Sequence, residues 1–318
     1  MCQKILEKVL NNQEITIDEA ISLIDCDLEQ LKNAANLIRE HFCHNKFDLC
    51  TIINAKSGKC SEDCKFCRQS SHYPTDVETY DLLGEGTIIN QAKDDESKGV
   101  PRFSIVTSGR NLNSSEFKQI IKIYQKLKQQ TDLSLCASLG LLNLEQFKQL
   151  KALGISKYHN NLETSKNHFK NICTTHSYQQ KIETIKKAKE ASLQVCSGGI
   201  IGMQESWRDR IDLAFELKKL NIQSIPLNIL NPISKTPLEH LPLLSKEEIE
   251  RTFAIFRFIN PQAFIKLAGG RILLDDLGLS IFKSGANGAI TGDMLTTKGV
   301  SIKDDLQMIK QLGFEVIK

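Results

Sequence analysis

Three cysteines near residue 60 carry the most specific chemistry in the sequence. Cys60, Cys64 and Cys67 have the spacing C-x3-C-x2-C within GKCSEDCKFCRQSSH, residues 58–72. Thiolates at this spacing can wrap one soft metal centre. Structural zinc normally takes four ligands, usually from paired C-x2-C units, and no second unit lies nearby. A four-iron cluster held by three cysteines leaves one iron open for another ligand. We therefore favour an iron–sulfur cluster over zinc or incidental buried thiols.

The composition restricts the classes of protein to consider. The chain has 318 residues, ten cysteines and a net charge of +3. The N-terminus lacks the apolar core of a secretion signal, and ten cysteines without such a signal favour metal or redox chemistry over disulfides. No run approaches the roughly 18 apolar residues of a membrane span. The lysines of residues 118–128 fit a solvated helix face. We expect a cytoplasmic protein with no membrane or nucleic-acid partner.

The elements that must position these cysteines follow a regular alternation. Short β-branched runs predict strands at 50–56, 103–108, 133–138, 157–162, 193–197, 224–230, 264–268 and 288–291. Amphipathic stretches predict helices at 86–98, 114–130, 143–152, 178–191, 206–220, 245–258, 273–284 and 302–312. Eight strand–helix units in alternation favour an α/β fold of the (β/α)8 TIM-type barrel class, with an open doubly wound sheet as the alternative.

The first 45 residues differ from the rest of the chain. They have helical apolar spacing, and Thr16 with Glu19 forms a predicted capping box. We therefore expect a helical N-terminal extension over 1–45 and a barrel domain over 46–318. The three-cysteine loop directly follows the first predicted strand, which is the face where barrel active sites lie.

The three-cysteine pattern, with Phe66 before the last cysteine, resembles the radical S-adenosylmethionine (SAM) superfamily. The resemblance implies a 4Fe-4S cluster on Cys60, Cys64 and Cys67. It also implies that SAM binds the open iron and is cleaved to a 5′-deoxyadenosyl radical. Phe66 matches an aromatic residue whose backbone contacts adenine.

Longer segments narrow the resemblance to the biotin synthase family. They are YHNNLETS (158–165), NICTTHSYQQKIETI (171–185), VCSGGIIGMQES (195–206), IPLNILNPISKTPLE (225–239) and KLAGGR (266–271). The family converts dethiobiotin to biotin with sulfur from an auxiliary iron–sulfur cluster, either 2Fe-2S or larger. The resemblance also implies a flavodoxin or ferredoxin-type electron donor and a homodimer.

The resemblance assigns roles to residues beyond the cluster loop. Besides Phe66, the positions that match SAM-binding residues are Asn161, Glu163, His176, Gly199 and Ile200. The positions that match substrate-binding residues are His159 and Asn228. Three of these depart from the common pattern: Glu163 replaces an aspartate, His159 an asparagine and His176 an arginine. The alternative interpretation of each is a satisfied polar group at a strand end.

The auxiliary-cluster positions match the family only in part. Cys136 and Cys196 are present, whereas Ser104 and Lys266 occupy the positions of the family's third cysteine and its arginine. Serine and lysine are poor iron ligands beside a thiolate. Cys50 and Cys173 are candidate replacements, as in a subset of the family from anaerobes that is thought to carry a four-iron auxiliary cluster. The alternative is that some of these are ordinary core cysteines.

Two other functions remain open from the sequence. One is another radical SAM barrel enzyme, of the hydrogenase-maturation or rearrangement type, which needs no sulfur donor. The other is a protein without enzymatic activity, such as a cluster-binding redox sensor or a zinc-structured protein. The cysteines at 136 and 196 argue against the first, and the length of the matching segments argues against the second.

Overall fold

A closed barrel of parallel strands forms the centre of the computed structural model, which describes residues 1–318. The ring runs β1 (Lys46–Lys56), β2 (Arg102–Thr107), β3 (Ser134–Ser138), β4 (Lys157–His159), β5 (Gln194–Cys196), β7 (Ser224–Ile229), β8 (Phe264–Leu267) and β9 (Gly288–Ile290). Pairing of β1 with β9 closes it. Two short strands lie off the ring, β6 (Gly199–Ile201) on β7 and β10 (Glu315–Val316) on β1.

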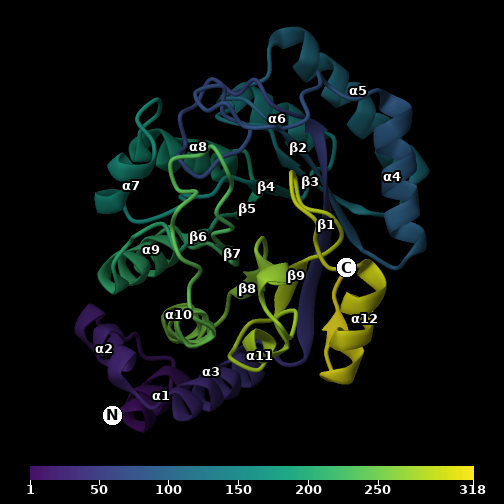
Figure 1. Ribbon diagram of the computed structural model, residues 1–318. Helices are drawn as coiled ribbons and strands as arrows, with labels where there is room; N and C mark the ends of the chain where they lie inside the picture. Colours follow the sequence, from purple (N-terminus) through teal and green to yellow (C-terminus); the bar gives the residue numbers. More distant parts are fainter.

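Helices cover the outside of the barrel (Figure 1). They are α4 (Glu85–Ser97), α5 (Ser114–Gln130), α6 (Leu144–Ala152), α7 (Lys166–Ile172), α8 (Tyr178–Glu190), α9 (Trp207–Lys219), α10 (Lys246–Ile259), α11 (Leu279–Phe282) and α12 (Ile302–Gln311). Their buried faces and the outward faces of the strands form one apolar core. Tyr124 of α5 also donates a hydrogen bond to Cys136 O at 2.6 Å, which ties this helix to β3.

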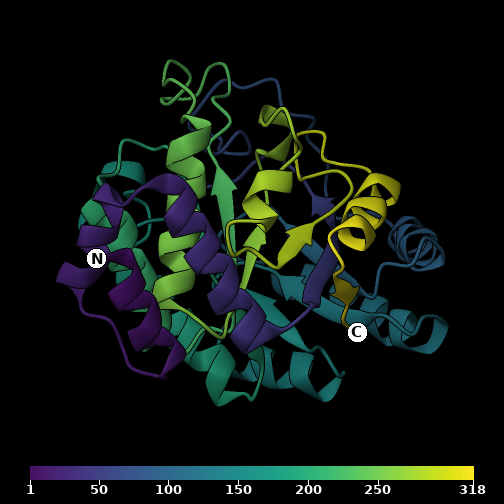
Figure 2. The same ribbon diagram turned by 90° about the horizontal axis from the view of Figure 1, so that it is seen from below.

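The first 43 residues form three further helices outside the ring, α1 (Cys2–Leu10), α2 (Ile17–Ser22) and α3 (Leu28–Cys43). α3 packs along α10, and Figure 2 shows the two side by side. The predicted capping box at Thr16 and Glu19 is confirmed. Whether this extension is a domain separate from residues 46–318 stays a prediction.

The strands and most helices lie where the sequence predicted them, but the helix expected over 273–284 is wrong in most of its length. A 3-10 turn (Arg271–Leu273) and the four-residue α11 take its place. Leu277 has φ 51° and Gly278 φ 92°, so the backbone enters the left-handed region that ends helices. Asp276 stabilises this turn by accepting from Gly278 N and Ser280 N. Three short elements, α7, β6 and β10, were not predicted from the sequence.

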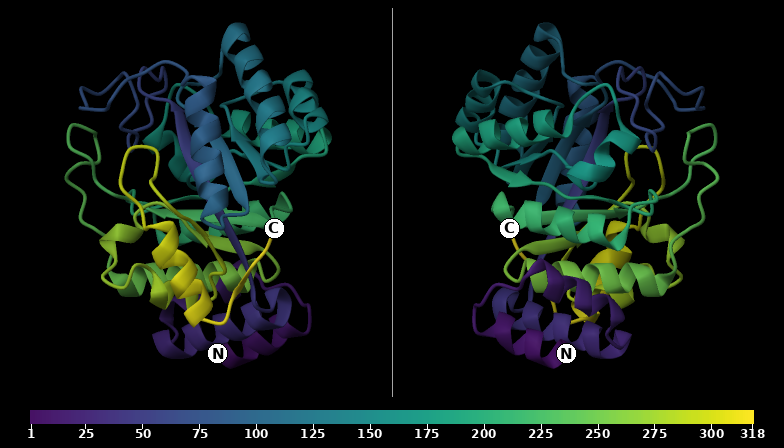
Figure 3. Two further views of the ribbon diagram at one scale, coloured as in Figure 1. Left: turned by 90° about the vertical axis from the view of Figure 1, so that its right-hand side faces the viewer. Right: turned by 90° about the vertical axis from the view of Figure 1, so that its left-hand side faces the viewer.

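The loops that follow the strands gather on one face of the barrel. Figure 3 shows the segments 57–84, 230–245 and 291–301 projecting from the same side. In a parallel barrel this is the carboxyl-end face, which carries active sites.

No helix in the structure has both the length and the apolar character required to span a bilayer.

Candidate active site: two groups of thiols in one barrel

The first group of thiols lies in the loop between β1 and α4. Backbone hydrogen bonds fold this loop on itself: Cys60 N donates to Gln69 O at 3.0 Å, and Ser71 N donates to Cys60 O at 2.8 Å. Cys67 N donates to Cys64 O at 2.9 Å, which closes a turn between the last two cysteines. Cys60, Cys64 and Cys67 are half-buried and line one cavity. The loop therefore presents three thiols to a common space.

Two adjacent acids dock this loop onto the segment after α7. Asp63 Oδ1 accepts from Thr174 N at 2.8 Å and from Thr175 N at 3.1 Å. Glu62 Oε2 lies 2.6 Å from His176 Nδ1. Neither acid was predicted from the sequence, although two carboxylates between metal-binding cysteines are a signal, because such charges need partners. The docking fixes which residues face the cluster loop.

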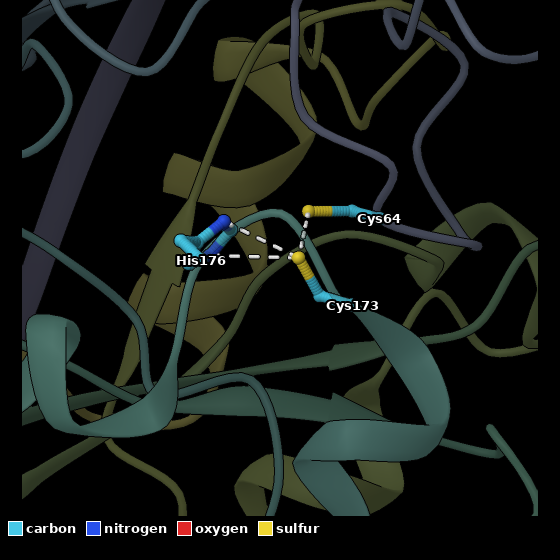
Figure 4. Close-up of side chains that lie close together, drawn as sticks. All are labelled: Cys64, Cys173 and His176. Carbon is cyan, nitrogen blue, oxygen red and sulfur yellow. Dashed lines mark hydrogen bonds between the residues drawn. The ribbon is translucent and has the colours of Figure 1, made fainter.

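The docking brings Cys173 and His176 beside Cys64 (Figure 4). Cys173 Sγ lies 3.7 Å from Cys64 Sγ and 3.2 Å from His176 Nδ1. The hydrogen bond from the Cys64 thiol lowers the pKa of Cys173 to about 4, and the contact with His176 acts in the same direction. The hydrogen bond between the two sulfurs also raises the pKa of Cys64 far above its usual value. The loop and the segment after α7 thus meet at a thiol–thiol contact.

The cavity above these thiols has a volume of about 430 Å³, which suits a small-molecule ligand. Its lining includes most of the side chains that the resemblance assigned to SAM and substrate: Phe66, His159, Asn161, Glu163, His176, Ile200 and Asn228. Asn228 bridges two strand ends, because its Nδ2 donates to Gly199 O at 3.2 Å and its Oδ1 accepts from Gly269 N at 2.8 Å. The structure therefore brings these predicted residues together around one space.

Gly199 does not line the cavity but sets the position of Glu163. A Cβ atom at residue 199 would lie 2.4 Å from Glu163 O, so only glycine permits the close approach. Ile200 N donates to the same carbonyl oxygen at 2.8 Å. Glu163 itself has φ 69°, an uncommon conformation for a residue with a side chain. Burial raises the pKa of its carboxyl group. Lys181 acts in the opposite direction, with its Nζ 4.0 Å from Glu163 Oε1.

The second group of thiols lies inside the barrel on three different strands. Cys50, Cys136 and Cys196 are each at most 1% exposed. They project from β1, β3 and β5, and none lines the cavity described above. Ser104 is the Cα partner of Cys136 on the neighbouring strand. Ser224 Oγ donates to Cys196 Sγ at 3.3 Å.

A buried ionic network surrounds these three thiols. Asp48 is fully buried, and its carboxylate lies 2.9 Å from Lys266 Nζ, 2.7 Å from Lys157 Nζ and 3.2 Å from Arg102 Nε. Lys266 Nζ also lies 3.7 Å from Cys50 Sγ, and Arg102 Nη1 lies 3.9 Å from Cys136 Sγ. Three cations and one carboxylate leave two positive charges uncompensated, so the surroundings favour an anionic occupant or thiolates.

The charged residues of this network shift one another's protonation. The three cations hold the pKa of Asp48 far below its usual value, although burial opposes them. Burial lowers the pKa of Lys266, but Asp48 and the thiols outweigh it and hold that pKa above the usual value. Sequence reasoning identified Lys266 but missed Asp48, Arg102 and Lys157. Charged residues within otherwise apolar strands were the available signal, because such side chains are rarely buried without partners.

His159 lies between the two groups of thiols. It lines the cavity, and it is the Cα partner of Cys196 on the adjacent strand. Burial, together with Lys266 and Lys157, lowers the pKa of His159 to about 3, so the imidazole is neutral. His159 Nε2 and Ser104 Oγ are buried without any hydrogen-bond partner. Unpaired atoms, excess cations and clustered thiols together fit a bound anionic metal–sulfur group.

Cys173, which sequence analysis grouped with Cys50, Cys136 and Cys196, lies elsewhere. Its sulfur contacts Cys64, Asp63, Thr175 and His176, so it belongs to the loop group. The cause is the docking of the cluster loop through Asp63, a contact between residues more than a hundred positions apart. Cys50, by contrast, does lie with the buried thiols.

Two protein families match the chain along most of its length. The Radical SAM superfamily matches residues 55–217. The Biotin and Thiamin Synthesis associated domain matches residues 226–315.

Similar proteins agree with these families. The chain is 55% identical over 313 residues to "Biotin synthase" of Clostridium botulinum (strain Loch Maree / Type A3), covering 98% of both chains. It is 54% identical to "Biotin synthase" of Brachyspira hyodysenteriae (strain ATCC 49526 / WA1), covering 98% of this chain and 93% of that one.

Solved structures share the fold at much lower identity. The crystal structure of methylornithine synthase has a TM-score of 0.85 at 17% identity, covering 99% of this chain and 97% of that one. The hydrogenase maturase HydG has a TM-score of 0.86 at 16% identity, covering 99% and 75%.

Proposed function

The chain belongs to the biotin synthase family of radical SAM enzymes, and we propose that it converts dethiobiotin to biotin with two iron–sulfur clusters on the two groups of thiols. The observation that carries this proposal is the position of both groups relative to one cavity. Cys60, Cys64 and Cys67 line the cavity. His159 also lines it and lies beside Cys196 of the buried group, its partner on the adjacent strand. A substrate in the cavity would lie between the two.

The loop residues fit the SAM-binding cluster. Cys60, Cys64 and Cys67 would hold three irons of a 4Fe-4S cluster and leave the fourth for SAM. When bound, this cluster and SAM supply the 5′-deoxyadenosyl radical that abstracts hydrogen from dethiobiotin. The side chains of Phe66, Asn161, Glu163, His176 and Ile200 lie where they would hold SAM over the loop, with Gly199 behind them. Bound SAM and substrate would displace water from the cavity and so protect the radical.

The buried residues fit the auxiliary cluster that supplies sulfur. We propose Cys50, Cys136 and Cys196 as its thiolate ligands. The ammonium group of Lys266 is engaged by Asp48 and has no free lone pair, so Lys266 acts as a counter-charge and not as an iron ligand. Arg102 and Lys157 add two further positive charges beside the thiolates. Three thiolates on four irons leave one iron for a further anionic ligand, which matches the excess of positive charge.

The substrate residues of the proposal are His159 and Asn228. Dethiobiotin carries a cyclic urea, which offers both hydrogen-bond donors and acceptors. His159 Nε2 has no partner, and the Asn228 amide keeps one N–H and one lone pair beyond its bonds to Gly199 and Gly269. A flavodoxin or ferredoxin-type electron donor, a homodimer and a cytoplasmic location stay predictions that rest on the resemblance alone.

Product analysis tests the proposal. The full-length protein is purified without oxygen, its clusters are reconstituted, and it is incubated with dethiobiotin, SAM and a strong reductant. Mass spectrometry then quantifies biotin and 5′-deoxyadenosine. We expect both from the parent protein, 5′-deoxyadenosine alone from Cys50→Ala, and both from the control Cys26→Ala, which lies outside both groups. Radical formation without biotin in the parent would contradict the sulfur-insertion function.

A further inference from the structure

Cys173 has no role in the chemistry described above, and the SAM-binding role proposed for His176 does not explain its contact with Cys173. Cys173 Sγ, Cys64 Sγ and a ring nitrogen of His176 all lie within 4.8 Å of one another (Figure 4). Cys173 and His176 are buried. We propose that, in the enzyme before cluster assembly, these three side chains bind one soft divalent cation such as Zn²⁺ or Fe²⁺.

The separations between the sulfur and nitrogen atoms support this site. Ligands at ~2.3 Å (sulfur) and ~2.0 Å (nitrogen) from a tetrahedral metal lie about 3.5–3.8 Å from each other. The Cys64 and Cys173 sulfurs are 3.7 Å apart. Cys173 Sγ and His176 Nε2 are 3.8 Å apart. The two sulfurs thus already have the separation of two thiolate ligands. Cys173 Sγ lies closer to His176 Nδ1, at 3.2 Å, than to Nε2, so the imidazole ring must turn for Nε2 to face the cation.

Glu62 orients the histidine for this role. Glu62 Oε2 lies 2.6 Å from His176 Nδ1 and accepts the proton of that nitrogen. The Nε2 nitrogen then carries the free lone pair, as in metal sites where a carboxylate orients a ligating histidine. Thr175 Oγ1 donates to the same carboxylate oxygen at 3.0 Å and fixes it in place. The arrangement thus includes a supporting hydrogen-bond network as well as the three ligands.

The fourth position of the cation faces the cavity. Cys64 and His176 both line that cavity, so water or a small anion can reach the metal. Asp63 is not available, because its Oδ1 already accepts from the backbone of Thr174 and Thr175. Two thiolates and one imidazole are ligands that zinc and ferrous iron accept.

The cation and the four-iron cluster exclude each other, because both need Cys64. This consequence rests on the proposed role of Cys64 in the SAM-binding cluster, whereas cation binding itself does not. Zn²⁺ bound first would hold Cys64 and slow cluster assembly. A variant without Cys173 would lose that sensitivity and keep the three cysteines of the loop.

A titration with Co²⁺ on the cluster-free, full-length protein tests the site. Tetrahedral Co²⁺ with thiolate ligands gives visible and near-ultraviolet absorption bands that report its ligands. We expect one Co²⁺ per chain with thiolate bands, displaced by Zn²⁺. Cys173→Ile should weaken binding by roughly a hundredfold or more, and Glu62→Gln by roughly tenfold to a hundredfold. Cys60→Ala should bind like the parent.

The Cys60→Ala and Cys173→Ile variants distinguish binding at this site from binding at the three cluster cysteines. Equal binding by Cys173→Ile and the parent, or no thiolate bands in the parent, would overturn the proposal. Loss of binding in Cys60→Ala would also overturn it, since Cys60 would then be a ligand of the metal. If Cys173→Ile does not fold by circular dichroism, His176→Asn removes the nitrogen ligand instead and should show the same loss.

Zinc inhibition of cluster assembly tests the exclusion separately. The parent protein preloaded with one equivalent of Zn²⁺ should take up iron and sulfide for the loop cluster more slowly than the metal-free protein. Cys173→Ile should show no such delay. An equal delay in both would contradict mutual exclusion, yet it would leave the product analysis of biotin formation unaffected.

Discussion

The two groups of thiols in this barrel differ in how the protein positions them and balances their charge. Cys60, Cys64 and Cys67 lie within eight residues on one loop, which is held by its own backbone hydrogen bonds and by the contacts of Glu62 and Asp63 with the segment after α7. Cys50, Cys136 and Cys196 come from three strands, and an ionic network around Asp48 surrounds them. The loop group borders an open cavity, whereas the strand group is fully buried.

The difference shows two ways to build a cluster site. A loop site depends on local spacing and leaves a coordination position open to a ligand from the cavity. A buried site needs compensating charges among its neighbouring side chains, because an uncompensated charge in the interior destabilises the protein. The excess of buried cations therefore belongs with the thiolates and their anionic occupant. Changes that disturb this balance should affect the buried site and leave the loop site intact.

Asp48→Asn should give the largest effect on stability. The substitution leaves Lys266, Lys157 and Arg102 without their shared counter-charge, and breaking a buried pair in this way costs about 3–5 kcal/mol. Urea unfolding of the cluster-free protein measures the loss. The control Asp94→Asn removes the exposed Asp94–Lys98 pair and should cost far less, because exposed ion pairs contribute little to stability. Equal losses in the two variants would show that the network does not stabilise the barrel.

Lys266→Met should affect the buried site selectively. It removes one of the three cations, and losing a charge-assisted contact of about 1.5–3 kcal/mol corresponds to roughly a tenfold to hundredfold effect. We expect biotin formed per 5′-deoxyadenosine to fall by that factor while SAM cleavage continues. Lys266→Arg keeps the charge and should retain most of the biotin yield. If both variants behave alike, the positive charge at residue 266 is not what the auxiliary site needs.

Gly199→Ala should affect the SAM side of the cavity. Its Cβ would lie 2.4 Å from Glu163 O, and forcing such a contact costs about 1–3 kcal/mol. We expect weaker SAM binding, measured by calorimetry on the reconstituted protein. Gly86→Ala is the matched control, because its Cβ would meet nothing within 4 Å. Unchanged SAM affinity in Gly199→Ala would remove Glu163 from the proposed binding site.

Cys173→Ile should have the smallest effect on catalysis. The side chain lies with the loop group but is not one of the three proposed cluster ligands. We expect biotin and 5′-deoxyadenosine yields within about twofold of the parent once both clusters are reconstituted. A selective loss of biotin would instead assign Cys173 to the auxiliary site and contradict the division of the thiols into these two groups.

The sequence predicted the loop group better than the buried group, for a physical reason. The spacing of Cys60, Cys64 and Cys67 is local, and the alternation of strands and helices was regular enough to place all eight strands. The positions of Cys50 and Cys173 depended on contacts between distant segments, and the sequence could not separate them. Docking through Asp63 drew Cys173 to the loop, and the inward alternation of β1 placed Asp48 and Cys50 in the barrel.

Mössbauer spectroscopy of two triple variants tests the central claim most directly. One variant replaces Cys60, Cys64 and Cys67 with alanine, and the other replaces Cys50, Cys136 and Cys196 with serine, both reconstituted with ⁵⁷Fe. We predict that each keeps one cluster, and that only the cluster in the second variant changes its spectrum when SAM is added. A variant with the loop cysteines removed that holds no cluster, or a buried-site variant that keeps both, would contradict the assignment of the two groups.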